Sequence, residues 1–201
     1  MVQGLAAVEG PIREAVREVL ALDAALDRAA GAAREVIGRS KRLISTAHRH
    51  EDTDRALAGL EAAMADLRRA VERRPELLST GTIVGALQEY AEAMATVAIL
   101  DDREPPGYEE LGIGPVPYVL GLADSVGELR RAMLDSISAG DLGSAERLLG
   151  AMRTIYDLLA ACVVRNEVTP LRRKVDVARA LVERSHGDLT QARLMLGKDR
   201  D

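Results

Sequence analysis

Apolar residues recur every three or four positions along most of the chain, and this spacing is typical of amphipathic helices. The first apolar stripe runs from Ile12 to Ile44 and predicts one helix of about nine turns. No alternating pattern of useful strand length is present. We therefore expect an all-α bundle of seven helices with short connections. The expected helices span residues 11–49, 53–73, 80–100, 117–139, 143–165, 170–185 and 188–196.

Prolines and glycines mark where these helices begin and end. Pro11 stands where a first-turn proline is tolerated, and the second helix ends before Pro75. Gly140 follows the fourth helix in the place of a left-handed C-terminal cap. Residues 101–117 contain four prolines and three glycines and form the one long loop that we expect.

The composition agrees with a helical core. A chain of 201 residues with 47% hydrophobic residues is long enough for one domain, over 1–201, and too short for two ordinary ones. Aromatic residues make up only 2% and are all tyrosines, so the core must be built from aliphatic side chains and alanine. This mixture favours packed helices over sheets.

Charge and cysteine content limit the function classes. The chain has 27 Lys and Arg against 32 Asp and Glu, a net charge of −5, which argues against a protein that coats nucleic acid through a generally basic surface. The single Cys162 excludes an internal disulfide and a cysteine zinc cluster. The N-terminus lacks the pattern of a signal peptide, and no stretch approaches about 18 consecutive apolar residues. We expect a cytoplasmic protein without membrane contact.

Two of the expected helices each carry a pair of carboxylates stacked on one face. Glu89 and Glu92 are three residues apart, and Asp124 and Glu128 are four apart. Like charges stacked in this way repel, unless a cation or a hydrogen-bond donor lies between them. For Glu89 and Glu92 a solvated helix face and a functional pair are equally good interpretations.

Asp124 and Glu128 follow the apolar run 118–123, and carboxylates on a mostly buried helix need partners. The small residues Gly121 and Gly127 leave room for a ligand or for another backbone. Four carboxylates without Cys or His suit a hard cation such as Mg²⁺ or Mn²⁺ better than zinc. Such a cation activates water and neutralises charge on a phosphate.

Other candidate groups give weaker signals. A di-iron bundle needs two Glu-x-x-His pairs, and the chain has one, Glu183 with His186. His48 and His50 point to different sides of a helix and are interpreted as surface residues. The basic clusters are ordinary solvated helix positions taken singly, and together they could supply phosphate contacts; they are Arg68-Arg69, Arg73-Arg74, Arg130-Arg131 and Arg172-Arg173-Lys174.

Four segments together resemble a known family. YVLGLADSVGELRRAMLDSISAGD, residues 118–141, looks like the signature helix of the translin and translin-associated factor X family, and LQEYAEA, residues 87–93, matches its factor X side. IREAVREVL near the start and LRRKVDVARALVER near the end extend the resemblance to roughly residues 10–193.

The resemblance implies a translin-like bundle of about seven helices and subunits that assemble into closed shells, commonly of eight. Translin binds single-stranded nucleic acid, and factor X supplies Mg²⁺-dependent endoribonuclease activity. The factor X motifs place the catalytic, metal-holding acids at Glu89, Glu92, Asp124 and Glu128. These are the four residues that their spacing had singled out.

The chain also departs from translin itself. GTIVGALQEYAEA stands where translin has a basic stretch containing His and Trp, so the chain resembles the catalytic partner more closely, and no RNA-binding residue is carried over. The short loop 101–117 and the minimal tail after Lys198 fit a compact homo-oligomer in which one chain both binds and cleaves RNA. The alternative is a particle that also contains a translin-like partner chain.

We expect an Mg²⁺-dependent endoribonuclease that cleaves single-stranded RNA, with Arg130 or Arg131 steadying the phosphate. The alternatives are a non-catalytic scaffold that binds single-stranded RNA or DNA, and a helical interaction module without RNA affinity. With so few aromatic side chains to stack on bases, RNA binding depends on phosphate and metal and has little sequence preference.

Overall fold

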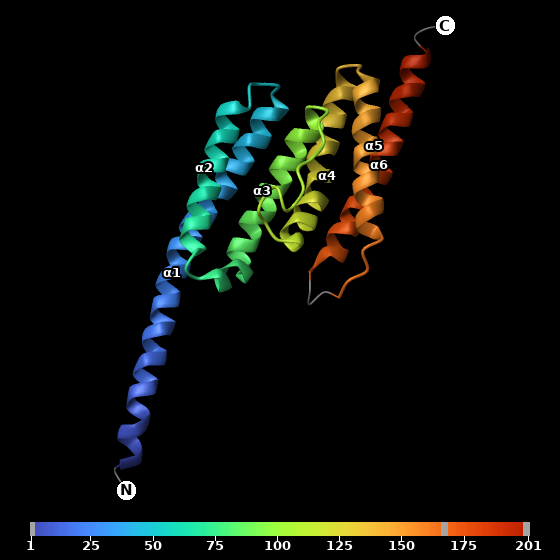
Figure 1. Ribbon diagram of the computed structural model, residues 1–201. Helices are drawn as coiled ribbons and strands as arrows, with labels where there is room; N and C mark the ends of the chain where they lie inside the picture. Colours follow the sequence, from blue (N-terminus) through green and yellow to red (C-terminus); the bar gives the residue numbers. More distant parts are fainter. Residues whose placement is uncertain (1–2, 166–168, 199–201) are drawn as a thin grey trace.

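The computed structural model describes residues 3–165 and 169–198, and all regular structure in these ranges is helical. Figure 1 shows the six α-helices in chain order. They are α1 (Gln3–His48), α2 (Asp54–Val71), α3 (Gly81–Leu100), α4 (Pro115–Ser138), α5 (Leu142–Ala160) and α6 (Leu171–Lys198), with a short 3₁₀ helix, η1 (Pro75–Ser79), between α2 and α3. The all-α prediction is confirmed.

The predicted number of seven helices is wrong by one. The two helices expected at 170–185 and 188–196 form the single helix α6, which runs through Gly187. Ala178, Val182 and Leu189 are buried in the same core cluster, at a helical spacing that keeps one face of α6 continuous across the glycine. A glycine inside a helix costs only about 1 kcal/mol, and this packing offsets it.

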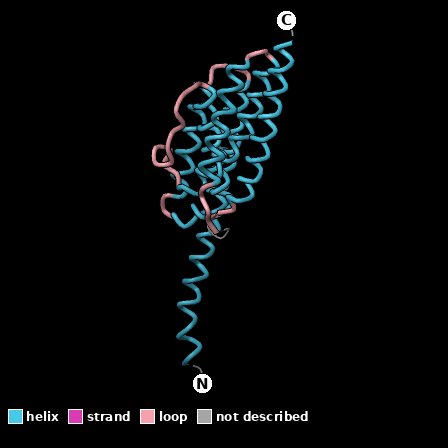
Figure 2. The backbone as a smooth tube through the Cα atoms, turned by 90° about the vertical axis from the view of Figure 1, so that its right-hand side faces the viewer, coloured by secondary structure: helices cyan, strands magenta, loops and turns pink. Residues whose placement is uncertain are grey.

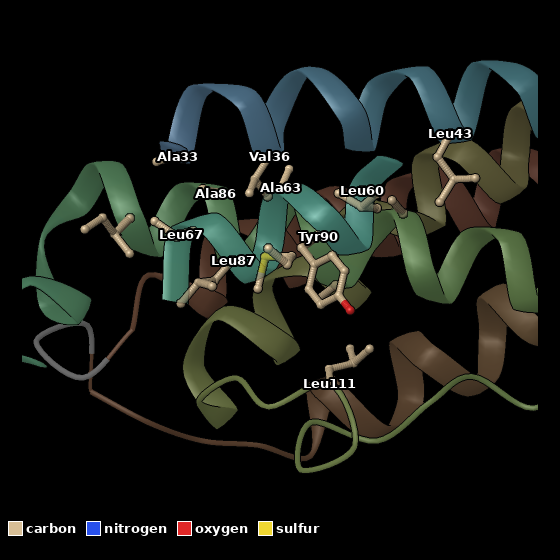
Figure 3. Packing of buried hydrophobic residues seen from close by; sticks show 14 of the residues in the cluster. Ala33, Val36, Leu43, Leu60, Ala63, Leu67, Ala86, Leu87, Tyr90 and Leu111 are labelled. Carbon is tan, nitrogen blue, oxygen red and sulfur yellow. The ribbon is translucent and has the colours of Figure 1, made fainter. Parts of the chain in front are cut away.

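The helices form two packed groups that meet at α3 and α4. α1 packs against α2 and α3, while α4 packs against α5 and α6, and α3 and α4 contact each other between the groups. Figure 1 shows the helices running side by side, with α3 and α4 in the middle, and Figure 2 shows the same bundle turned by 90°. Figure 3 shows the first core, between α1, α2 and α3. Its buried members include Val36, Leu43, Leu60, Leu67, Leu87 and Tyr90.

α3 passes a simple test for a membrane span. Gly81–Leu100 is long and apolar enough to cross a membrane by length and composition, although Gln88, Glu89 and Glu92 interrupt its apolar residues. Most of that helix is buried inside the protein, against α1 on one side and α4 on the other. Its apolar surface is therefore explained by its central place in the bundle.

The first half of α1 extends beyond the bundle. In Figures 1 and 2 this part of the helix projects away from the other helices. Its apolar side chains are 49–65% exposed; they are Val8, Ile12, Val16, Val19 and Leu20. A single chain therefore leaves an apolar helix face uncovered.

The turn between α4 and α5 has the predicted form. Gly140 has a φ of +78°, which confirms the left-handed cap. The side chain of Asp141 then accepts a hydrogen bond from the backbone N–H of Ser144, at 3.0 Å, and caps α5.

Candidate acidic site between α3 and α4

A glycine brings the two pairs of carboxylates together. A Cβ atom at Gly121 would lie 2.5 Å from the carbonyl oxygen of Gln88 and 2.8 Å from the backbone nitrogen of Glu92. Only glycine permits this approach, because the atoms in the way belong to the backbone of α3. At Gly127 a Cβ would meet nothing within 4 Å. Of the two glycines noted in the sequence, Gly121 is the one that sets the crossing of α3 and α4.

The pKa of the Glu92 carboxyl depends on the charges of the other three acids. Burial first, and then the charges of Asp124, Glu89 and Glu128, together raise the pKa of this carboxyl from the ordinary 4.5 to about 8. The ammonium of Lys174 acts in the opposite direction. Such interactions fall off within several ångströms, so the four predicted acids share one electrostatic neighbourhood.

Asp124 is held by side chains from two other helices. The Nζ atom of Lys174, on α6, donates to Oδ1 at 2.6 Å and to Oδ2 at 2.7 Å. Gln88, on α3, donates a short hydrogen bond from Nε2 to Oδ2. The side chains of Lys174 and Asp124 are 26% and 28% exposed, so the interpretation of Lys174 as a solvated position is wrong. The stripe of Leu171 and Ala178, both buried, turns Lys174 toward α4.

Glu128 is held by a histidine from α1. The Nε2 atom of His48 lies 2.7 Å from Oε2 of Glu128, and the His48 side chain is only 3% exposed. The interpretation of His48 as a surface residue is therefore wrong, whereas His50 is exposed. The hydrogen bond from His48 is the largest cause that lowers the pKa of Glu128, and Arg131 lowers it further. An ionised carboxylate only accepts hydrogen bonds, so Nε2 of His48 carries the hydrogen.

The donor chemistry fits a hard cation. All four acids provide oxygen, which suits Mg²⁺ or Mn²⁺. Within residues 3–165 and 169–198, no three His, Cys, Asp or Glu side chains are already gathered closely enough to hold a metal ion. Asp124 and Glu128 instead bind Lys174, Gln88 and His48. The residues thus fit the ion by their donor chemistry, while two of them are occupied by protein donors and the four would have to move closer to hold it.

The comparison with known proteins decides the family. The translin family profile matches residues 26–186. The chain belongs to the translin family. A relative, the uncharacterized protein MJ0175 of Methanocaldococcus jannaschii, is 31% identical over 161 residues, which cover 78% of this chain and 71% of that protein.

Solved structures agree with this translin-family assignment. The chain is similar to AfC3PO, in a crystal structure of that protein (TM-score 0.80) and in its complex with duplex RNA (TM-score 0.81), at 30% identity in both. These matches cover 92% of this chain and 98% and 97% of the AfC3PO chains. Apo-NeC3PO is 21% identical, with a TM-score of 0.79 over 90% of this chain and 96% of its own, and shows the shared fold alone.

In this translin-family chain the two arginines proposed as phosphate ligands differ. Arg130 donates to Ser185 Oγ and to Asp188 Oδ2, both at 2.7 Å, and thereby joins α4 to α6. Both bonds would have to break before Arg130 could contact a phosphate, so its role there stays a prediction. Arg131 is exposed and acts on Glu128 through its charge, so it stays a candidate.

The remaining candidate groups have structural partners. Glu183 pairs with Arg179 at 3.3 Å, and His186 contacts Arg153 at 2.8 Å. Arg68 donates to the carbonyl of Leu111 at 2.6 Å and anchors the loop between α3 and α4. The sequence pattern gave no signal for Gln88, His48 or Lys174 as partners of the acids, because each comes from a different helix than the carboxylate that it binds.

Proposed function

We propose that this protein is an Mg²⁺-dependent endoribonuclease that cleaves single-stranded RNA. The observation that carries the proposal is the shared neighbourhood of Glu89, Glu92, Asp124 and Glu128, in which three negative neighbours and burial raise the pKa of Glu92 to about 8. A site that holds several carboxylates together at such a cost is typical of a functional site. The likeness to AfC3PO, which has been solved with duplex RNA, supports RNA as the substrate class.

In the proposed mechanism the four acids would hold one or two Mg²⁺ ions, which would supply an activated water and neutralise charge on the scissile phosphate. The protein's part is to orient the ligands. His48 fixes the Glu128 carboxylate, Gln88 fixes Asp124, and Gly121 keeps α3 and α4 close enough for all four to act together. With a pKa of about 8, Glu92 holds a proton at neutral pH, and it would have to lose this proton to solvent before it could act as a metal ligand.

We propose one exposed residue beside the acids as the contact for RNA phosphate, and one exposed helix face as the contact between subunits. Arg131 is exposed beside Glu128 and is the proposed phosphate contact. The uncovered apolar face at the start of α1 supports assembly with further copies into a closed, translin-like shell, for which eight subunits are expected. A shell admits flexible single strands more readily than duplex. We propose a homo-oligomer, with a translin-like partner chain as the alternative composition.

The test is cleavage of labelled RNA by the purified protein with Mg²⁺ or with a chelator. Single strands and duplex are compared, because AfC3PO has been solved with a duplex. Glu92→Gln and Asp124→Asn are expected to abolish cleavage, and Asp135→Asn, an exposed acid on the same helix α4, is the matched control and keeps it. Identical products from all variants, with or without metal, would attribute the cleavage to contamination and end the enzyme proposal.

One observation favours the second candidate, a non-catalytic scaffold that binds single-stranded RNA or DNA. Asp124 and Glu128 already have protein partners, Lys174 and His48, as structural ion pairs would. This function predicts RNA binding that a chelator leaves unchanged, with no cleavage. Filter binding of the same RNA in chelator, beside the cleavage assay, separates the two functions.

A further inference from the structure

The ammonium of Lys174 lies where a divalent cation would bind Asp124. Nζ contacts both carboxylate oxygens, at 2.6 and 2.7 Å, and so occupies the fork between them. A cation that uses both oxygens of a carboxylate lies in the same fork. The fork between the two oxygens cannot hold both at once, because two positive charges at that distance would repel and would overlap sterically.

The positive charge of Lys174 already offsets part of the negative charge of the acids, as a bound cation would. Its charge acts on Glu92 as well as on Asp124, and opposes the three acids that disfavour ionisation of Glu92. The Gln88 amide also contacts Oδ2, but it is neutral and lies on α3. Displacement of Lys174 would thus leave Asp124 oriented by Gln88.

The place of Lys174 in the fold allows such a displacement. It lies in the first turn of α6, and its side chain is 26% exposed beside the exposed Arg172 and Arg173. A lysine stem has four rotatable methylene groups, so Nζ can swing into solvent while Leu171 and Ala178 keep the helix packed. The exchange therefore needs a rotamer change and no movement of a helix.

We infer that Lys174 is a built-in competitor for the divalent cation at Asp124: it neutralises the metal-free site, leaves the carboxylate when the ion binds, and sets the metal concentration at which the site fills. This inference rests on the proposed function, since it assumes that Asp124 is a metal ligand. Lys174 is a positioning residue in this scheme. It disfavours monovalent ions, because an ion of the same charge gains no electrostatic energy by replacing an ammonium already in contact.

The first experiment measures Mn²⁺ binding to the metal-free full-length protein by the loss of the electron paramagnetic resonance signal of free Mn²⁺. Lys174→Met is expected to bind Mn²⁺ about tenfold more tightly than wild type, because no ion pair must be broken. Lys174→Arg keeps the charge and adds a planar fork that matches the carboxylate, so it is expected to bind more weakly. Arg173→Met removes the same charge from an exposed neighbour on α6 and is expected to match wild type.

The second experiment needs no substitution. The chain contains only three lysines, Lys41, Lys174 and Lys198, so an amine-specific acetylating reagent followed by mass spectrometry reports each one. Mg²⁺ is expected to speed acetylation of Lys174 severalfold, because the freed ammonium enters solvent. Lys41 is exposed and is the internal control, with an unchanged rate.

The outcomes separate this inference from the proposed function. If Mn²⁺ binds wild type but not Asp124→Asn, while Lys174→Met binds no more tightly and Mg²⁺ leaves Lys174 acetylation unchanged, the competitor role is overturned and the metal site stands. If neither wild type nor Lys174→Met binds Mn²⁺, the metal site itself fails, and the inference fails with it. Should Lys174→Met not fold, as judged by circular dichroism, the acetylation experiment on wild type decides alone.

Discussion

His48 donates a hydrogen bond to Glu128 across a sequence separation of 80 residues, from the last turn of α1 to the middle of α4. The contact joins the first helical group directly to the acidic site. Because the His48 side chain is almost completely buried, removal of either partner leaves a polar group without its bond.

We therefore expect His48→Ala to destabilise the protein by about 1–3 kcal/mol. In a double-mutant cycle with Glu128→Gln, the coupling energy should be about 0.5–3 kcal/mol. Urea denaturation of the two single variants and the double variant measures it. His50→Ala, at an exposed neighbouring residue, is the control and should behave like wild type. Additive effects of the two substitutions would show that the bond contributes nothing to stability.

Gly121→Ala should destabilise the protein by about 3 kcal/mol or more, because the new Cβ would lie 2.5 Å from the carbonyl oxygen of Gln88. The helices α3 and α4 would have to separate, and the acids on them would move apart. Gly127→Ala places its Cβ in open space on the same helix and should raise stability by up to about 1 kcal/mol. Thermal denaturation compares the two, and equal effects would contradict the role of Gly121.

Because the pKa of Glu92 is raised in the folded state, we expect the stability of the protein to fall as the pH rises. Burial first, and then the charges of Asp124, Glu89 and Glu128, raise its pKa from 4.5 to about 8 in the folded state. Between these two pH values the folded protein binds a proton that the unfolded chain has released, so the free energy of unfolding decreases as the pH rises, and levels off above pH 8.

Glu92→Gln stays neutral and removes this dependence. In chelator, the variant should match wild type near pH 5 and exceed it near pH 8 by on the order of 4 kcal/mol. Urea denaturation at several pH values checks this, with Asp135→Asn as an exposed acid for comparison. Wild-type and Glu92→Gln curves that run parallel across the range would show that the pKa of Glu92 is not raised.

We expect substitution of Arg130 to lower the stability of the protein and substitution of Arg131 to weaken its RNA binding. Arg130→Met breaks the bonds to Ser185 and Asp188 and should cost about 1–3 kcal/mol of stability. Arg131→Met should leave the stability within about 0.5 kcal/mol of wild type and weaken RNA binding at low salt. Denaturation and filter binding measure the two effects, and an unchanged RNA affinity for Arg131→Met would remove it as a phosphate contact.

The exposed stripe on α1 should be an assembly contact. Replacing Ile12 and Val16 with Asp is expected to reduce the oligomer to smaller species in native mass measurement, since both side chains are more than half exposed in the single chain. Circular dichroism should stay helical, because neither side chain contributes to the buried cores. A wild-type protein found only as a 21.6 kDa monomer would contradict the shell.

The sequence predicted helices well wherever burial follows a regular period. The stripes that became α2 and α3 place Leu60 and Ile83 in the core, as their helical spacing predicts. The break expected at Gly187 was wrong because local propensity favours a stop there, whereas the packing of Leu189 against α4 and α5 favours one continuous helix. Such packing energy depends on neighbours that are distant in the sequence.

The sequence by itself determined the helical class, the two pairs of acids and the glycine between them, because helical spacing and residue size are local properties. Only the tertiary structure decided which partners those acids have. His48, Gln88 and Lys174 come from three other places in the chain, and no spacing rule connects them to Asp124 or Glu128. The electrostatic state of a carboxylate depends on charges and burial within a few ångströms, and that distance is set by how the helices cross.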